Sequence, residues 1–120
     1  MGRLLIHITC GPESPTRAAL GLLVARAACD KGHDVDVFLA GDGVQLIREP
    51  VLDSLNGLGT GSLRESFDAV VKAGGRFFVC PVCFDAKQLD KGDLIAGAEI
   101  NGTVPMWQWI GDEGATTFSY

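Results

Sequence analysis

The sequence predicts an α/β fold: a three-layer sandwich with a mostly parallel sheet of about five strands and helices on both faces. Short apolar runs of strand length alternate along the chain with longer segments whose apolar residues recur at helical spacing. Glycine or proline ends most of these segments. Strands that alternate with helices in this way pair in parallel through right-handed crossovers.

The expected strands are short and largely apolar. Residues 4–10 form a nearly continuous apolar run that stops at Gly11-Pro12, which is typical of a buried strand. The expected strands cover residues 4–10, 35–40, 77–80, 98–101 and 115–120.

The first expected helix has a clear start and end. Ser14 is expected as its N-cap, Pro15 occupies its first position, and Lys31-Gly32 close its last turn. A short helix follows the second strand; Asp42 is expected to cap it and Pro50 to end it.

The second half of the chain begins with a glycine-rich segment, residues 56–61, which is expected to be flexible. Ser62 and Glu65 then form a capping box that predicts a helix up to Gly74-Gly75. Two further helical segments are expected, over residues 81–89 and 104–110.

The chain has 120 residues, 47% of them hydrophobic, and no repeat or linker, which predicts a single domain over residues 1–120. This composition excludes intrinsic disorder. Such a short, apolar chain is expected to leave hydrophobic surface after folding, so we expect a homo-oligomer. The last helix supports the expectation of an oligomer, because Trp107 and Trp109 cannot share one helical face. We therefore expect it to be buried on more than one side, in part by another subunit.

The charge and the apolar pattern limit the partners. The net charge is −5 and no run of Lys or Arg is present, so neither nucleic acid nor an anionic membrane is expected to bind. No stretch reaches the roughly 18 apolar residues that a membrane-spanning helix needs. His7 interrupts the N-terminal apolar run, so no secretory signal is expected. The 4 cysteines are therefore expected to be reduced thiols in the cytoplasm.

The functional crevice of an open parallel sheet lies beyond the carboxyl ends of its strands. Segments 10–17, 40–43, 80–84 and 101–105 are expected to meet there.

The Cys80-Pro81-Val82-Cys83 turn carries the clearest chemical signal. Cys80 ends an expected strand, and Cys83 comes one turn later, near a helix start. Unpaired N–H groups and the helix dipole at such a position stabilise the thiolate, which is the nucleophilic form of cysteine. Three chemical interpretations remain open: a redox pair, a pair of zinc ligands, and a single reactive cysteine with an incidental neighbour. The alternative to all three is that both cysteines are packed thiols without a chemical role. Zinc is the weakest of these interpretations, because the chain offers one C-x-x-C, two distant cysteines and two histidines. No metal site is therefore predicted, and no cofactor is expected.

The turn before the first helix is a candidate anion site. Ser14, Arg17 and the helix N-terminus could together hold a sulfur oxyanion or a partner's carboxylate. A well-capped helix with a solvated Arg17 explains the same residues. Cys10 ends the first strand and would lie near Cys80 if the two strands were neighbours; the alternative is a core thiol. His7 is interpreted as a hydrogen-bonded core residue.

Three motifs occur in a fixed order along the chain: G-P-E-x-P-x-R-A at residues 11–18, F-L-A-G-D-G-V at residues 38–44, and the strand-end Cys80. Together they resemble the DsrE/DsrF-like family over essentially the whole chain. The resemblance implies a small α/β sandwich that assembles into trimers or hexamers in the cytoplasm. It also implies that Cys80 carries sulfur as a persulfide. Cys80 would then face a cleft near a subunit boundary, where sulfur-donor and sulfur-acceptor proteins meet it.

The leading functional hypothesis is therefore a sulfur-trafficking, sulfurtransferase-like protein in which Cys80 accepts and passes on sulfane sulfur. Arg17 would bind the anionic end of a donor. Cys83 would resolve the Cys80 persulfide as a disulfide, with release of sulfide. Two alternatives remain open: an oligomeric binding or scaffold module without catalysis, and a thiol–disulfide oxidoreductase that uses both cysteines.

Overall fold

The computed structural model describes residues 2–120 and contains a five-stranded sheet in which neighbouring strands are parallel. The strand order is β6-β5-β2-β1-β7. The strands are β1 (Arg3–Ile8), β2 (Asp34–Leu39), β5 (Arg76–Val79), β6 (Ala98–Ile100) and β7 (Thr116–Ser119). Each begins within one residue of its expected start, and the expected α/β architecture is confirmed.

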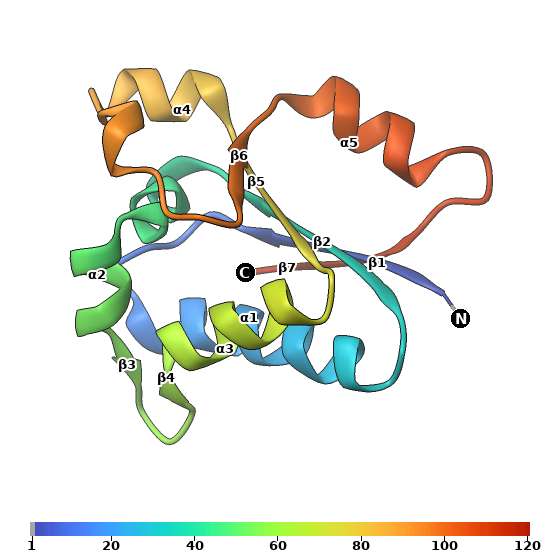
Figure 1. The fold of residues 1–120 in the computed structure, drawn as a ribbon, viewed down its shortest axis with the longest axis horizontal. Helices are drawn as coiled ribbons and strands as arrows, with labels where there is room; N and C mark the ends of the chain where they lie inside the picture. The colour runs from blue at the N-terminus through green and yellow to red at the C-terminus, as the bar shows by residue number, and fades with distance from the viewer. Residues whose placement is uncertain (1) are drawn as a thin grey trace.

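Helices cover the two faces of the sheet unequally. Figure 1 shows α1 (Pro15–Asp30) and α3 (Leu63–Lys72) on one side and α5 (Thr103–Ile110) on the other. α4 (Pro81–Ala86) follows β5 at the carboxyl end of the sheet. The connection from β6 to β7 joins opposite edges of the sheet, and α5 is its helix. One short helix therefore has to span the width of the second face.

The main core lies between the sheet and the layer of α1 and α3. Ile6 pairs in register with Val37, and Val37 with Phe77, and all three side chains are at most 1% exposed. Phe67 of α3 stacks on Phe77, with ring centroids 4.3 Å apart. α1 packs closely because it is rich in small residues: a Cβ at Gly21 would lie 2.8 Å from a side-chain atom of β1.

The second face of the sheet is polar near the amino ends of its strands and apolar further along. Arg76 donates hydrogen bonds of 3.1 and 3.2 Å to the carboxylate of Asp36, which is 1% exposed. Phe38 and Phe78 come next, are neighbours in register and are buried. The expected burial of the last helix is wrong for the single chain, because none of the 8 residues of α5 is buried. α5 therefore covers this face incompletely.

Two local expectations in the first half of the chain are wrong. Pro50 lies in the first turn of α2 (Glu49–Ser54) and does not end a helix, because a proline there needs no partner for an N–H group. The segment before it is a 3-10 helix, η1 (Gly41–Ile47), whose N-cap is Ala40. Asp42 lies inside η1 and caps nothing, since its carboxylate pairs with Lys87.

The glycine-rich segment is a hairpin of β3 (Asn56–Gly57) and β4 (Gly61–Ser62), although we expected a flexible loop. The hairpin contacts α1, where the amide of Leu58 donates to Oγ1 of Thr16 at 3.1 Å. Half of the expected capping box is present, because the Ser62 side chain accepts a hydrogen bond from the amide of Glu65.

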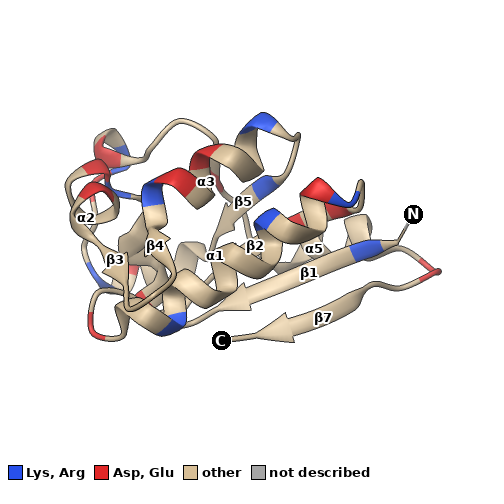
Figure 2. Cartoon of the chain, turned by 90° about the horizontal axis from the view of Figure 1, so that it is seen from below, with Lys and Arg blue, Asp and Glu red and all other residues tan. Residues whose placement is uncertain are grey.

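Charged residues gather where α2 approaches α3, whereas β7 contains none (Figure 2). Arg64 of α3 forms ion pairs with Asp53 of α2, at 3.2 Å, and with Asp68, at 3.1 Å. A second 3-10 turn, η2 (Lys91–Asp93), precedes β6. Among the helices of residues 2–120, none has the length and apolar character needed to cross a membrane.

Candidate functional site

Cys80 follows β5 directly and lies at the carboxyl edge of the sheet. Its amide donates to the carbonyl of Leu39 at 2.9 Å, which extends the hydrogen bonding between β2 and β5 by one residue. Its carbonyl accepts from the amide of Phe84, also at 2.9 Å, and Cys80 is the N-cap residue of α4. The backbone of Cys80 is therefore held between a central strand and the start of a helix.

The side chain of Cys80 lines a cavity of about 290 Å³ on the second face of the sheet, which we name the Cys80 cavity. Its other lining residues come from β1, from β2 and its end, and from α5: Leu5, His7, Phe38, Ala40, Thr103 and Met106. The cavity lies where α5 crosses the carboxyl half of the face without filling it. A thiol, an imidazole and several apolar side chains thus surround one space.

His7 forms part of the wall of this cavity. Its ring meets Phe38 edge-on, with centroids 5.4 Å apart and an angle of 80° between the planes. Burial lowers the pKa of His7 from its ordinary 6.5, so the imidazole is neutral at neutral pH. The sequence-based interpretation as a core histidine is therefore incomplete, since the ring is half-buried and faces a cavity.

Cys83 lies in the first turn of α4, half-buried against the main core. One turn later, Nζ of Lys87 lies 2.6 Å from Oδ1 of Asp42, and this hydrogen bond raises the pKa of Lys87. The ion pair joins α4 to η1. All 4 cysteines are free thiols, and residues 2–120 contain no cluster of three His, Cys, Asp or Glu side chains that could hold a metal ion.

Cys10 does not join this site. β2 lies between β1 and β5, so the strands that precede Cys10 and Cys80 are not neighbours. Cys10 is 5% exposed and belongs to the main core. Burial raises the pKa of its thiol, and the negative charge of Glu13 raises it further. This environment is that of a packed core thiol.

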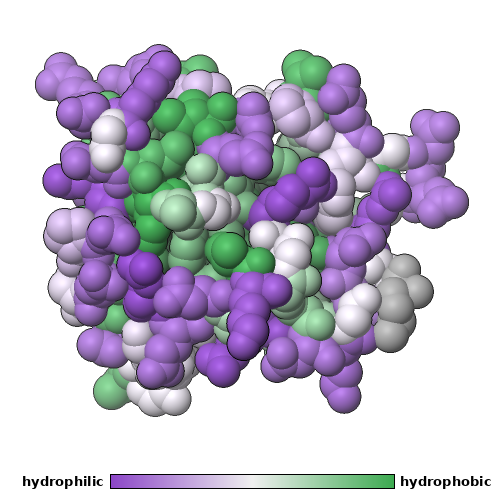
Figure 3. All heavy atoms as spheres, viewed as in Figure 1, coloured by the Kyte–Doolittle hydropathy of each residue, from purple (hydrophilic) through white to green (hydrophobic). Residues whose placement is uncertain are grey.

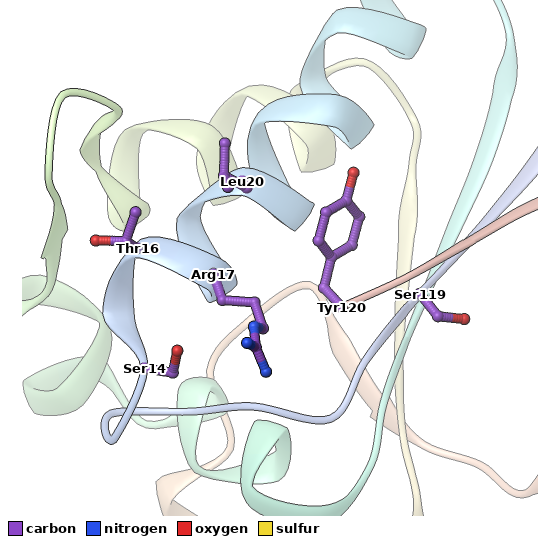
Figure 4. Close-up of a pocket in the computed structure, with 6 residues that line it drawn as sticks. All are labelled: Ser14, Thr16, Arg17, Leu20, Ser119 and Tyr120. Carbon is purple, nitrogen blue, oxygen red and sulfur yellow. The ribbon is translucent and has the colours of Figure 1, made fainter.

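Arg17 and Ser14 line a different cavity, of about 500 Å³, beside α1 and the end of β7. Figure 4 shows the guanidinium of Arg17 between Ser14 and Tyr120. Ser14 is the N-cap of α1, but its side chain makes no capping hydrogen bond. The expected anion-binding residues are thus together, but they do not share a cavity with Cys80.

Sequence reasoning missed most of the lining of the Cys80 cavity. The alternation of side chains along β1 places Leu5 and His7 on the face opposite Ile6, and this pattern is the signal that could have found them. Met106 has no such signal, because its place depends on the path of α5 across the sheet.

Comparisons with known proteins agree with this architecture. The family model described as the DsrE/DsrF-like family matches residues 2–118. The crystal structure of the ychN protein from E. coli matches with a TM-score of 0.81 at 20% identity over the full length of both chains. A protein of unknown function from Methanobacterium thermoautotrophicum, MTH1491, matches with a TM-score of 0.74 at 18% identity, also over both full lengths.

A third solved structure is more distant. BT1422 from Bacteroides thetaiotaomicron matches with a TM-score of 0.65 at 12% identity over 98% of this chain and 94% of that chain. No curated protein is significantly similar in sequence. At these identities the solved structures establish the fold.

Proposed function

Because this chain belongs to the DsrE/DsrF-like family, we propose that it is a sulfur-trafficking protein in which Cys80 carries sulfane sulfur as a persulfide. The observation that carries the proposal is the location of Cys80. Its thiol lies directly after β5, an interior strand of the sheet, is half-buried and opens on a cavity that a second molecule can enter. A reactive cysteine needs such access, whereas a purely structural one does not.

The transfer is an exchange between thiols and persulfides. The Cys80 thiolate attacks the outer sulfur of a donor persulfide, and the S–S bond of the donor breaks. The donor leaves as a thiolate with the bonding electrons, and Cys80 keeps the outer sulfur. The reverse exchange delivers the sulfur to an acceptor, so neither half consumes an oxidant or a reductant.

Cys83 has a separate role in this proposal. It lies three residues after Cys80 within the first turn of α4, a spacing that brings side chains close on a helix. Its thiolate attacks the inner sulfur of the Cys80 persulfide, forms the Cys80–Cys83 disulfide and releases hydrosulfide. The same pair would serve a thiol–disulfide oxidoreductase, which needs both cysteines and no added sulfur.

We also propose that the protein acts in the cytoplasm as a trimer or hexamer that exchanges sulfur with donor and acceptor proteins. Large apolar side chains that the single chain leaves exposed support an oligomer, among them Val104 at 66% and Trp107 at 65%. In the view of Figure 3, hydrophobic atoms also gather between the positions of α4 and α3. The same surfaces favour the alternative of a binding or scaffold module without catalysis.

Mass spectrometry of the intact protein tests the proposal. The reduced protein is incubated with polysulfide as wild type, Cys80→Ser, Cys83→Ser and Cys29→Ser. Cys29→Ser is the matched control, because Cys29 is a half-buried thiol in α1, outside the Cys80 cavity. Cys83→Ser is expected to keep one added sulfur atom on Cys80. The wild type and Cys29→Ser are expected to take up the same sulfur and then to lose it as hydrosulfide, ending as the Cys80–Cys83 disulfide, and Cys80→Ser is expected to show neither change.

Other outcomes separate the alternatives. A loss of two hydrogens in the wild type, with no added sulfur on Cys83→Ser, would favour the oxidoreductase. No mass change with any donor would favour the binding module. Sulfur uptake by Cys80→Ser that equals the uptake by Cys83→Ser contradicts the proposed role of Cys80.

A further inference from the structure

The Cys80 cavity has an uncharged lining. Of its 7 lining residues, only Cys80 and His7 have titratable side chains, and no Lys, Arg, Asp or Glu contributes. A charged ligand would lose its hydration there without gaining an ion pair, which is costly. An apolar surface gains free energy when it leaves water for such a site. The lining therefore selects against charged molecules.

The size of the cavity limits the ligand further. Its volume is about 290 Å³, whereas an apolar cavity of about 150 Å³ is large enough to bind benzene. An aromatic ring or a short alkyl chain that carries one functional group therefore fits.

His7 and Cys80 lie on opposite sides of the cavity floor. His7 belongs to β1 and pairs in register with Phe38 of β2, whereas Cys80 follows β5 on the far side of β2. One small molecule between them can contact both side chains. The neutral imidazole can donate or accept one hydrogen bond at its end of the cavity, and the sulfur chemistry takes place at the other end.

We propose that the Cys80 cavity binds a small uncharged organic thiol with an apolar body, and that this thiol is an acceptor of sulfur from Cys80. Its role as an acceptor rests on the function proposed above, but the binding of an uncharged molecule does not. The acceptor gives its thiol proton to solvent, and its sulfur attacks the outer sulfur of the Cys80 persulfide. The S–S bond breaks, Cys80 leaves as a thiolate with the bonding electrons, and the acceptor leaves as a hydropersulfide.

The second cavity strengthens this assignment by contrast. Arg17, the charged side chain that would suit an anionic sulfur compound, lines the cavity beside β7 and not the Cys80 cavity. Anionic molecules such as thiosulfate therefore have no cationic partner among the residues that surround Cys80.

Protection of Cys80 from alkylation tests the binding without requiring sulfur transfer. The Cys83→Ser protein is used, so that Cys80 is the single cysteine of the segment 77–87. It is treated with iodoacetamide in the presence of benzyl alcohol, benzoate or benzylammonium, and labelling of Cys80 is measured by peptide mass spectrometry. Benzyl alcohol stands in for a thiol without reacting. The charged analogues are expected to need at least about tenfold higher concentrations for equal protection.

Two substitutions on α5 locate the binding. Thr103 lines the cavity, whereas Val104 is the next residue, does not line it and is 66% exposed. Thr103→Phe is expected to fill the space and to weaken protection by benzyl alcohol by about fivefold or more. Val104→Phe is expected to leave the protection by benzyl alcohol unchanged. Both positions are exposed, so both variants are expected to fold.

The outcomes distinguish this inference from the proposed function. Equal protection by the three compounds, protection by none, or equal loss in both variants overturns the uncharged ligand site. Sulfur uptake on Cys80 without protection by benzyl alcohol would leave the proposed function standing and remove this inference. Protection by benzyl alcohol alone, lost in Thr103→Phe and kept in Val104→Phe, supports the site even if Cys80 takes up no sulfur.

Discussion

Nζ of Lys87 lies 2.6 Å from Oδ1 of Asp42, so one ion pair joins the residue after α4 to the start of η1. The two segments follow β5 and β2, which are neighbours in the sheet. The ion pair therefore holds α4, with Cys83 in its first turn, against the carboxyl edge of the sheet where Cys80 lies.

Removal of this ion pair is expected to loosen α4 more than the rest of the fold. In Lys87→Met the amide hydrogens of α4 are expected to exchange about two to five times faster than in the wild type. The amides of α3 serve as an internal control and should be unchanged. Hydrogen exchange at low and high salt measures the effect, and high salt should reduce the difference because it screens the pair. Unchanged exchange in α4 would show that the pair does not restrain this helix.

The stacked rings of Phe67 and Phe77 are expected to be a major source of stability. Phe77 is 1% exposed, so Phe77→Leu loses both ring stacking and buried volume. Its free energy of unfolding should fall by about 1–3 kcal/mol, measured by urea denaturation. Phe118→Leu is the matched control at a side chain that is 40% exposed, and should change stability by less than about 0.5 kcal/mol. Equal losses in both variants would contradict this account of the core.

Gly43 allows η1 to lie directly against the end of β1. A Cβ there would overlap the carbonyl oxygen of Ile8, a backbone atom that cannot move aside easily. Gly43→Ala is therefore expected to lower the free energy of unfolding by about 1–3 kcal/mol. Gly92→Ala is the control, since its nearest contact would be the Asp90 side chain at an ordinary 3.4 Å. The midpoint temperature of thermal unfolding should be clearly lower for Gly43→Ala than for Gly92→Ala.

The buried carboxylate of Asp36 is expected to weaken the fold at neutral pH. Burial raises the pKa of Asp36 above its ordinary 3.8, although the hydrogen bond from Arg76 lowers it. A carboxyl group whose pKa is higher in the folded chain contributes stability below the unfolded pKa and loses it as the pH rises through the folded value. Asp36→Asn should therefore be at least as stable as the wild type at neutral pH, and the difference should shrink towards about pH 4.

Urea midpoints across this pH range measure the effect of Asp36. Asp34→Asn is the matched control, because Asp34 lies on the same strand with an exposed side chain. If Asp36→Asn is less stable than the wild type at neutral pH, the ion pair with Arg76 outweighs the cost of burial, and this interpretation is wrong.

The secondary structure was predictable where the local pattern has one physical explanation. β1 is an apolar run that a Gly-Pro pair follows, and a run of this length is typical of a buried strand because it is too short for a buried helix. Pro50 was misread because proline is compatible with both the residues after a helix and the first turn of the next one. The hairpin at residues 56–62 was missed because its strands have two residues each, too short for any alternation to be visible.

The candidate site was predictable only in part. The place of Cys80 after a strand is a local property, so the sequence sufficed for it. The separation of Arg17 from Cys80 depends on the strand order, in which β2 stands between β1 and β5, and no local pattern encodes that order. The ion pair of Lys87 with Asp42 joins residues 45 positions apart in the sequence, so it too depends on the strand order and not on a local pattern.

The pairing of β1 with β7 has a consequence for how the chain is made. Leu4 pairs with Thr116, so a ribosome must add almost all of the residues described here before β1 acquires its second neighbour. Until then β1 has a bare hydrogen-bonding edge, which other nascent or misfolded chains can join. The growing polypeptide is therefore most vulnerable to aggregation at its first strand, and this strand is the segment that ribosome-associated chaperones would need to shield.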